Sequence, residues 1–324
     1  MTTVMDHPLP PRAELLAGVW RLPLPLKDSP LGHVNTYLVR ADDGYLLVDC
    51  GWDTADTLRA LEGHLRALDI RLPDIRHLVI THIHPDHYGL AGRLREITSA
   101  ELSFHRLERL YIESRYVDAD TLMGEMREWL HMNGTPAVEL DQLNRGSMSM
   151  MARVQVAFPD RTLDGGEEIP CGRYAFRVIW TPGHSAGHIC LYDARHKVLL
   201  SGDHVLPHIT PAVGLHVRTT SNPLADYMDS LRRLQGLELT VLYPGHGPEV
   251  RDPQAKIAEY LAHRREREDR LVAALDRGER SREALLAEVW DDVPEDLRGA
   301  AAIAMEAHLE KLEDEGRLPT DLRD

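Results

Sequence analysis

The chain has 324 residues, of which 43% are hydrophobic and 27% are charged. This length allows more than one folding unit, and no stretch approaches the roughly 20 apolar residues that a bilayer span requires. The net charge of −15 has the wrong sign for the phosphate contacts that dominate nucleic-acid affinity. We therefore expect a soluble protein with no role at a membrane, and the charge argues against a nucleic-acid partner while leaving a local basic groove possible.

The cysteines and the first residues bear on the cellular compartment. Three cysteines, odd in number and without CxxC spacing, predict neither a disulfide framework nor a zinc ribbon. Residues 1–12 are proline-rich and polar, where a secretory signal would carry an apolar segment behind basic residues. Both features favour a cytoplasmic protein.

The N-terminal half has the pattern of an α/β unit. Runs rich in apolar and β-branched residues predict strands at Asn35–Val39, Tyr45–Val48 and His77–Ile80. Between the last two, Asp53 can cap a helix. Leucines at helical spacing follow that cap: Leu58, Leu61, Leu65 and Leu68.

The middle segment, about residues 105–151, is predicted to be a helical insert rich in methionine. Its methionines are Met123, Met126, Met132, Met148, Met150 and Met151. Methionine fills gaps in ordinary helical packing, but it also suits an adaptable apolar lid over a binding site. Packing is slightly favoured, and the two roles are compatible.

A second strand-rich region follows the insert. Strands are predicted at Ala175–Thr181, His188–Tyr192, Lys197–Leu200 and Leu239–Tyr243, with a helix near Leu224–Leu234. Two strand-rich halves, each flanked by helices, predict two sheets packed face to face with helices outside. We expect residues 1–250 to form this domain.

Residues 251–324 are expected to form a smaller, winged-helix-like domain. Three charged helices are predicted at Pro253–Leu275, Arg282–Val293 and Pro294–Glu315. The segment carries 13 basic and 20 acidic residues, a balance of −7, which argues against reading DNA. Packing, homodimer formation or covering the active site are the remaining interpretations.

Residues capable of binding a metal are concentrated directly after the predicted strand His77–Ile80. Four of them lie within six positions: His82, His84, Asp86 and His87. Side chains two apart at a strand end point the same way, so His82 and His84 can share an ion while Ile83 faces the core. A lone histidine is usually a structural residue, but four such groups together predict a metal site.

Three more candidates follow predicted strands in glycine-containing turns. They are His184 in Thr181–His184, Asp203 in Ser201–Asp203 and His246 in Pro244–Gly247. Such turns let the backbone and a side chain approach an ion closely. The sequence therefore predicts one site assembled from several loops.

These seven residues, in this order, resemble the ligand pattern of the metallo-β-lactamase superfamily over roughly residues 18–248. The resemblance implies a four-layer αββα sandwich with two metals at one edge of the sheets. It also implies that His82, His84 and His184 hold one ion, that Asp86, His87 and His246 hold the other, and that Asp203 bridges them. The C-terminal helices resemble those of the lactamase-β-like branch, some members of which have ribonuclease activity.

The imidazole and carboxylate ligands suit two divalent ions, with Zn²⁺ favoured and Mn²⁺ or Fe²⁺ as alternatives. Two such ions can share a water, lower its pKa towards neutrality and stabilise a developing oxyanion. A bridging hydroxide is thus the expected nucleophile. We expect Asp86 and Asp203 to be catalytic as well as ligating.

Other residues near these turns are secondary candidates. Asp49 and His188 are expected to orient ligand histidines, or else to be turn and core residues. His204 and His208, in the irregular loop after Asp203, are candidate proton donors to a leaving group. That loop is equally well explained as a rigid connector.

Four functions remain open. The first is hydrolysis of a small ester, thioester or lactone, and the Met-rich insert would suit an acyl chain. The second is cleavage of single-stranded RNA at the same site, and the third is the mono-iron oxygen chemistry of the persulfide dioxygenases that the motif also resembles. The fourth is a non-catalytic metal-bearing scaffold, against which the complete ligand set argues.

Overall fold

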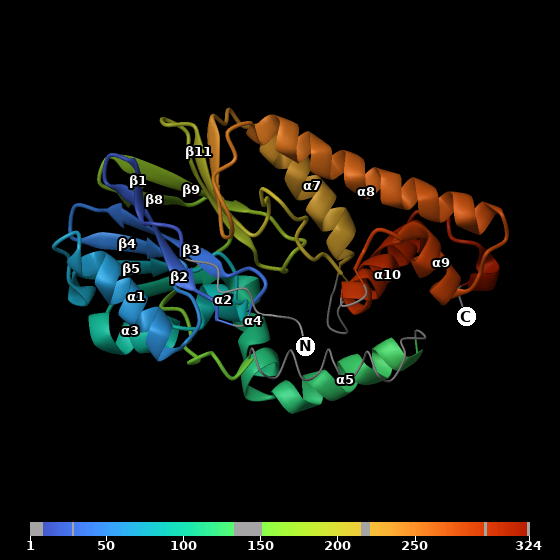
Figure 1. The fold of residues 1–324 in the computed structure, drawn as a ribbon, viewed down its shortest axis with the longest axis horizontal. Coiled ribbons are helices and arrows are strands. Elements are labelled where there is room, and N and C mark those ends of the chain that lie inside the picture. Colours follow the sequence, from blue (N-terminus) through green and yellow to red (C-terminus); the bar gives the residue numbers. More distant parts are fainter. Residues whose placement is uncertain (1–8, 28, 133–150, 215–220, 295–296, 323–324) are drawn as a thin grey trace.

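The computed structural model describes residues 9–27, 29–132, 151–214, 221–294 and 297–322, and its two β-sheets lie together on the left in Figure 1. The first sheet has seven strands in chain order. Neighbours are antiparallel from β1 to β4 and parallel from β4 to β7. The strands are β1 Ala13–Leu16, β2 Val19–Pro25, β3 His33–Arg40, β4 Tyr45–Val48, β5 Ile75–Val79, β6 Glu101–His105 and β7 Arg161–Leu163.

The second sheet has five strands in the order β12-β11-β10-β9-β8. All neighbours are antiparallel except β11 and β12, which run parallel. The strands are β8 Glu168–Cys171, β9 Tyr174–Trp180, β10 Ile189–Asp193, β11 Val198–Gly202 and β12 Val241–Pro244.

Strand periodicity explains how each sheet packs on both faces. On β4, Leu46 and Val48 enter the core between the two sheets, while Leu47 enters the core beneath α1 Ala55–Arg66 and α3 Ala91–Thr98. On β10, Leu191 faces the first sheet and Tyr192 faces the other way. Successive side chains of a strand point to opposite faces, so a sheet covered on both sides needs apolar residues at nearly every position.

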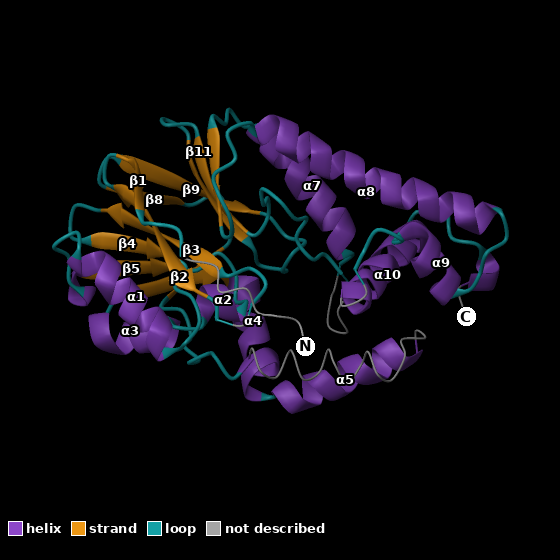
Figure 2. Ribbon diagram, viewed as in Figure 1, coloured by secondary structure: helices purple, strands orange, loops and turns teal. Residues whose placement is uncertain are grey.

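Helices cover the outer face of each sheet (Figure 2). On the second sheet they are α7 Pro223–Gln235 and the first half of α8 Pro253–Asp276, whose Ile257 and Tyr260 share a core with Leu224 and Leu231. The four layers of the expected αββα sandwich are therefore confirmed.

The C-terminal helices form a core of their own. The second half of α8 packs with α9 Arg282–Val289 and α10 Arg298–Asp314 through Leu271, Leu285 and Leu309 among others. Ala307 of α10 instead belongs to the core under α7. The C-terminal region is thus joined to the sandwich by α8 and by α10.

The first part of the insert is helical as expected, and part of the remainder lies outside the described residues. It contains α4 Arg106–Ile112, a π-helix Glu113–Val117 and α5 Ala119–Met132. Residues 133–150, with Met148 and Met150, lie outside the described residues, as do the side chains of Met126 and Met132. The described residues therefore do not test the two roles considered for the methionines.

Several local predictions need correction. Thr54 caps α1, because its Oγ1 accepts a hydrogen bond from the Thr57 amide at 3.1 Å, whereas Asp53 pairs with Arg93. The C-terminal α9 ends at Val289 and α10 begins at Arg298, so both are shorter than predicted. In the described part of the chain, no helix is both long and apolar enough to cross a membrane.

Candidate metal centre

The seven candidate ligands meet at one edge of the two sheets, because each follows the end of a strand. Four come from the loop and the short helix α2 Pro85–Tyr88 that follow β5. His184 lies between β9 and β10, Asp203 directly after β11, and His246 two residues after the end of β12. Loops at one edge of a rigid sheet scaffold are where binding residues usually gather.

The side chains form three overlapping groups, in each of which the potential ligand atoms lie within 4.8 Å of one another. They are His82, His84 and His184; His82, His87 and Asp203; and Asp86, His87 and His246. The structure therefore brings together all seven residues that the sequence singled out.

Asp203 lies between the two outer groups. One of its carboxylate oxygens is 3.4 Å from His87 Nε2, and the other is 3.4 Å from His246 Nε2 and 3.8 Å from His184 Nε2. Asp86 is within 3.2 Å of His246 Nε2 on the far side. A carboxylate that reaches both groups has the geometry of a bridging ligand.

Four polar atoms at the centre have no hydrogen-bond partner although they are buried: Nε2 of His87, of His184 and of His246, and Oδ1 of Asp203. Buried polar atoms are normally paired, and a set of unpaired donors and acceptors at one point indicates an ion. The residues present therefore fit a divalent metal with nitrogen and oxygen ligands.

The other ring nitrogen of each of these histidines is already occupied. Nδ1 lies 2.8 Å from a protein oxygen in every case: Asp49 Oδ2 for His87, the Ala212 carbonyl for His184, and the His33 carbonyl for His246. A hydrogen bond from Nδ1–H fixes the tautomer and leaves Nε2 free to bind a metal.

Asp49 is the support that the sequence suggested. Besides His87 it accepts hydrogen bonds from the Thr81 amide at 2.8 Å and the Thr81 hydroxyl at 2.9 Å. Its φ is 61°, in the left-handed region that non-glycine residues rarely adopt, and such strain recurs at functional sites. The carboxylate is thereby held rigidly against the ligand loop.

Gly245 allows the backbone to approach the centre closely. A Cβ at this position would collide with the Asp203 carboxylate and lie 2.7 Å from His87 Cε1. Any side chain here would displace two candidate ligands, which explains the glycine before His246.

The carboxylates of the centre create a negative electrostatic potential that favours a positive charge between them. Burial alone would lower the pKa of His87 and of His246, but the carboxylates of Asp203 and Asp86 outweigh it and raise the pKa of His246 to about 10. By contrast, burial together with the positive field of Arg115 lowers the pKa of the His84 ring well below its usual range. Divalent cations would supply the charge that the carboxylates attract.

The structure places the secondary histidines differently from the expectation. His188 accepts a hydrogen bond from the Asp203 amide on Nε2 at 3.1 Å, so it positions a carboxylate ligand and not a histidine. His204 is buried between His188 and Tyr227, burial lowers its pKa to about 3, and it does not line the pocket beside the centre. His208 is exposed and also lies outside that lining. The role of His204 and His208 as proton donors stays a prediction.

Glu108 of α4 is a functional residue that the sequence reading missed. Its buried carboxylate accepts hydrogen bonds from the Ile83 amide at 3.0 Å and the Gly187 amide at 2.6 Å. It therefore ties the His82–His84 loop to the His184 loop. Nothing in the local sequence distinguishes it from an ordinary helical glutamate.

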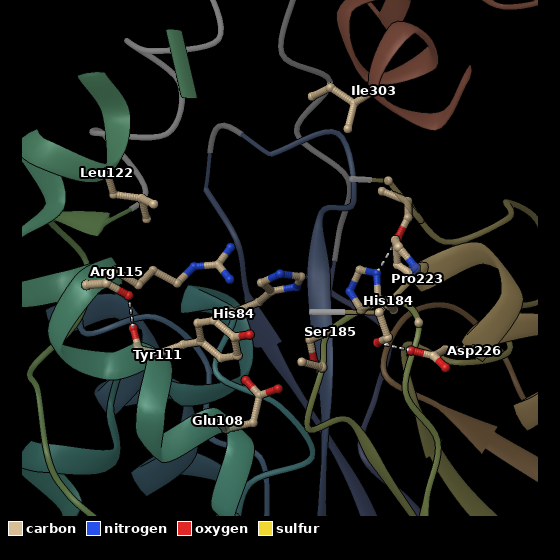
Figure 3. Close-up of a pocket in the computed structure, with 16 residues that line it drawn as sticks. His84, Glu108, Tyr111, Arg115, Leu122, His184, Ser185, Pro223, Asp226 and Ile303 are labelled. Atoms are coloured by element: carbon tan, nitrogen blue, oxygen red, sulfur yellow. Dashed lines mark hydrogen bonds between the residues drawn. The ribbon is translucent and has the colours of Figure 1, made fainter. Parts of the chain in front are cut away.

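A pocket with a volume of about 310 Å³ opens beside His84 and His184 (Figure 3). Its walls come from α4, the π-helix, α5, the loop before α7 and α10. The apolar lining residues include Leu122, Ala186, Ala212, Pro223 and Ile303. The centre thus faces a mainly apolar chamber of the size that a small molecule needs.

Comparison with known proteins agrees with the fold and the site. Residues 29–246 match the metallo-beta-lactamase superfamily, and residues 281–319 match the beta-lactamase associated winged helix domain. The second match confirms the winged-helix character of the C-terminal helices.

Individual relatives extend over most of the chain. The probable metallo-hydrolase YqjP of Bacillus subtilis is 31% identical over 268 residues, which is 79% of each chain. The beta-lactamase-like protein 2 homolog of Caenorhabditis elegans is 27% identical over 87% of this chain and 79% of its own. The atrochrysone carboxyl ACP thioesterase of Aspergillus fumigatus is 32% identical over 150 residues, 46% of this chain and 40% of its own.

A solved structure confirms the likeness in three dimensions. The metallo-beta-lactamase family protein of Thermus thermophilus superposes with a TM-score of 0.78 at 33% identity, over 94% of this chain and 95% of that one. With the site geometry and the family match in agreement, the chain belongs to the metallo-β-lactamase superfamily and is a metallo-hydrolase with a C-terminal winged helix.

Proposed function

We propose that this hydrolase uses two divalent cations, zinc in the first instance, to cleave a small ester, thioester or lactone. His82, His84 and His184 would hold one cation and Asp86, His87 and His246 the other, with Asp203 between them. The observation that carries the proposal is the set of unpaired, buried ligand atoms beside a pocket whose wall includes His84 and His184.

When bound, the cations supply an acidified water and neutralise the negative charge that develops on a carbonyl oxygen. The protein holds the ligand side chains in fixed orientations. Asp49 and the carbonyls of Ala212 and His33 keep the histidine rings aimed at the centre. His188 holds the backbone of Asp203 in place. Such pre-organisation means that no ligand has to move as charge develops.

The pocket favours an acyl group over a nucleotide. More of its described lining surface is apolar than polar, and it holds a single arginine, whereas RNA-binding sites combine several cations with stacked aromatic rings. The similarity to a thioesterase over part of the chain supports the same substrate class.

The test begins with metal analysis of the purified full chain. We expect two zinc ions per chain, loss of hydrolysis on chelation and recovery on adding zinc. A panel of neutral esters, thioesters, lactones and a single-stranded RNA then identifies the bond that is cleaved. RNA cleavage without acyl hydrolysis, or a single iron with oxygen consumption on a persulfide, would refute the proposal.

A matched pair of histidine variants checks the ligand assignment. His246→Ala should lose one metal ion and most activity. His77→Ala should keep both ions, because His77 is a partly exposed residue of β5 whose ring contacts Asp43 at 3.1 Å. Equal metal content in the two variants would remove His246 from the ligand set.

A further inference from the structure

Arg115 is a cationic residue in the wall of the pocket beside the metal centre. It belongs to the π-helix Glu113–Val117, and its guanidinium extends into the pocket towards His84 (Figure 3). A π-helical turn inserts one extra residue into a helix and so changes the direction of the side chains around it. Such turns are frequent at functional sites.

Two carboxylates, Glu108 and Asp226, line the same pocket as Arg115. Neither of them, nor any other carboxylate in the described parts of the chain, pairs with Arg115. Glu108 is committed to the amides of Ile83 and Gly187. Asp226, at the N-terminal end of α7, accepts a hydrogen bond from the Ser221 hydroxyl at 2.6 Å. As far as the described residues go, the guanidinium therefore has its hydrogen-bonding groups available to a molecule in the pocket.

Arg115 is the one arginine or lysine in the described lining of the pocket. Leu122, Ala186 and Ile303 are apolar, and the serines of the lining, such as Ser114 and Ser185, are uncharged. A guanidinium among them favours one anionic group on a ligand that is otherwise neutral. A guanidinium binds carboxylates and phosphates through two parallel hydrogen bonds, and such bonds are stronger away from bulk water.

We propose that Arg115 forms a subsite for an oxyanion carried by the acyl substrate. This inference rests on the proposed function, since the anion would lie on the molecule whose acyl bond is cleaved. The anion has two possible sources, a carboxylate at the far end of the acyl chain or a phosphate on the leaving thiol.

Paired thioesters separate these sources. S-glutaryl- and S-pentanoyl-N-acetylcysteamine have acyl chains of equal length and differ by a terminal carboxylate. S-pentanoyl-4′-phosphopantetheine and S-pentanoyl-pantetheine differ by a phosphate on the leaving group. For each pair the readout is the ratio of kcat/KM, anionic over neutral, for the zinc-loaded full chain.

We expect the wild-type ratio to exceed one for one of the pairs and to fall about 10- to 100-fold in Arg115→Gln, the range expected for a charged hydrogen bond. Arg115→Lys should recover part of it. Arg109→Gln is the matched control, because Arg109 is an exposed residue of α4 that packs over Phe158 outside the pocket. It should leave the ratio at the wild-type value.

Metal content and unfolding temperature are measured for each variant, so that a damaged fold is not mistaken for a lost contact. If Arg115→Gln binds both metals and leaves both ratios unchanged, the subsite does not exist. An equal change in Arg109→Gln would assign the effect to general surface charge and also overturn the inference.

A second readout separates this inference from the proposed function. Phenylglyoxal modifies accessible arginines, and mass spectrometry reports the rate at Arg115, with and without chelator. Glutarate or inorganic phosphate should slow modification of Arg115 but not of Arg109, whereas glutaramide should slow neither. If no acyl substrate is hydrolysed, the proposed function fails, while protection of Arg115 would still support an oxyanion subsite and its absence would refute it.

Discussion

At the scale of single residues, the centre depends on carboxylates whose charge is balanced by specific partners. Asp203 reaches both histidine groups, and burial opposes its charge while His246 and His87 lower its pKa well below the usual range. Asp49 is not a candidate ligand itself, but its carboxylate holds the ring of His87, which is one. Replacing either changes charge and geometry together.

Asp203→Asn should lower activity by about 10²-fold or more, the scale of other lesions in metal-site ligands and their supports. The amide offers one neutral oxygen, so we expect a metal to be lost or the pH–rate profile to move to higher pH. Turnover, zinc content and the unfolding midpoint are compared with those of Asp229→Asn, an exposed residue of α7 paired with Arg232. Near-wild-type turnover with two zinc ions would show that Asp203 does not bridge.

A second residue-scale prediction concerns Asp193, at the end of β10. Its buried carboxylate accepts hydrogen bonds from the amides of Ala175 at 2.9 Å and His196 at 2.7 Å. Burial acts to raise the pKa of Asp193, but these hydrogen bonds and the His196 ring prevail and lower it. A group with a depressed folded-state pKa stabilises the protein above its unfolded pKa, about 4, and this contribution is lost as pH falls through the folded pKa.

Asp193→Asn should therefore reduce the free energy of unfolding by about 1–3 kcal/mol at pH 7. The difference in unfolding free energy between the variant and the wild type should narrow as pH falls below about 4. Urea unfolding of the metal-free proteins at several pH values measures it. A gap that stays constant with pH would mean that shape and not charge is what Asp193 contributes.

At the scale of elements, α4 joins loops that are distant in the sequence. Glu108 bonds Ile83 and Gly187, residues 25 and 79 positions away from it. A strand or helix can be inferred from its own residues, but this contact exists only once the insert has folded back onto the sandwich. The first metal group is therefore supported from outside the strands that carry it.

Glu108→Gln should weaken the metal bound by His82, His84 and His184 more than the other metal, by about 10- to 100-fold in affinity, as for other residues that support ligands. The amide retains one acceptor, so one of the two loops loses its partner. Zinc titration with a chromophoric competitor resolves the two sites. Glu125→Gln, an exposed change on α5, is the control, and equal zinc binding by both variants would contradict this role for Glu108.

The elements also show which signals the sequence carries. The strands of the second sheet from β9 to β12 were predicted because they are continuous apolar runs. By contrast, β2 contains Pro23 and Pro25, which argue against a strand, and β7 has three residues. The ligand candidates were visible because they lie in short motifs in the segments that follow strands. Arg115 and Glu108 were not, because their positions depend on tertiary packing.

At the scale of the whole molecule, the sandwich and the winged helix share a core. Ile257, Tyr260 and Leu261 of α8 pack with α7, and Asn222 Nδ2 donates a buried hydrogen bond to the Ala307 carbonyl at 2.9 Å. The family match for the winged helix begins only at residue 281. The whole of α8 therefore lies between the two family matches, which end at residue 246 and begin at residue 281, and links them.

Truncation after Pro248 should prevent folding. It removes the α8 side chains that cover Leu224, Met228 and Leu231 of α7. Exposing these three buried side chains costs about 1.5–3 kcal/mol each, a large part of a typical unfolding free energy of about 5–15 kcal/mol. Solubility, circular dichroism and zinc binding of the truncated chain test this. A soluble, fully active fragment would show that residues 249–324 are dispensable.

A smaller change separates folding from substrate access. Ile303→Ser should retain two metals and the unfolding midpoint while changing KM for acyl substrates of different chain length, because Ile303 lines the pocket. Ala302→Ser, one position away on α10 and outside the lining, is the control. Equal KM values in both variants would exclude α10 from substrate selection.

The contribution of α10 to the pocket has an evolutionary consequence. All seven candidate ligands precede residue 247, whereas part of the chamber wall comes from Ile303. Mutations in the winged helix can therefore alter which molecules enter without touching the residues that carry out hydrolysis. If the pocket binds the substrate as proposed, lineages that share the same centre can diverge in the compounds they accept through substitutions in α10, whose described residues include none of the candidate ligands.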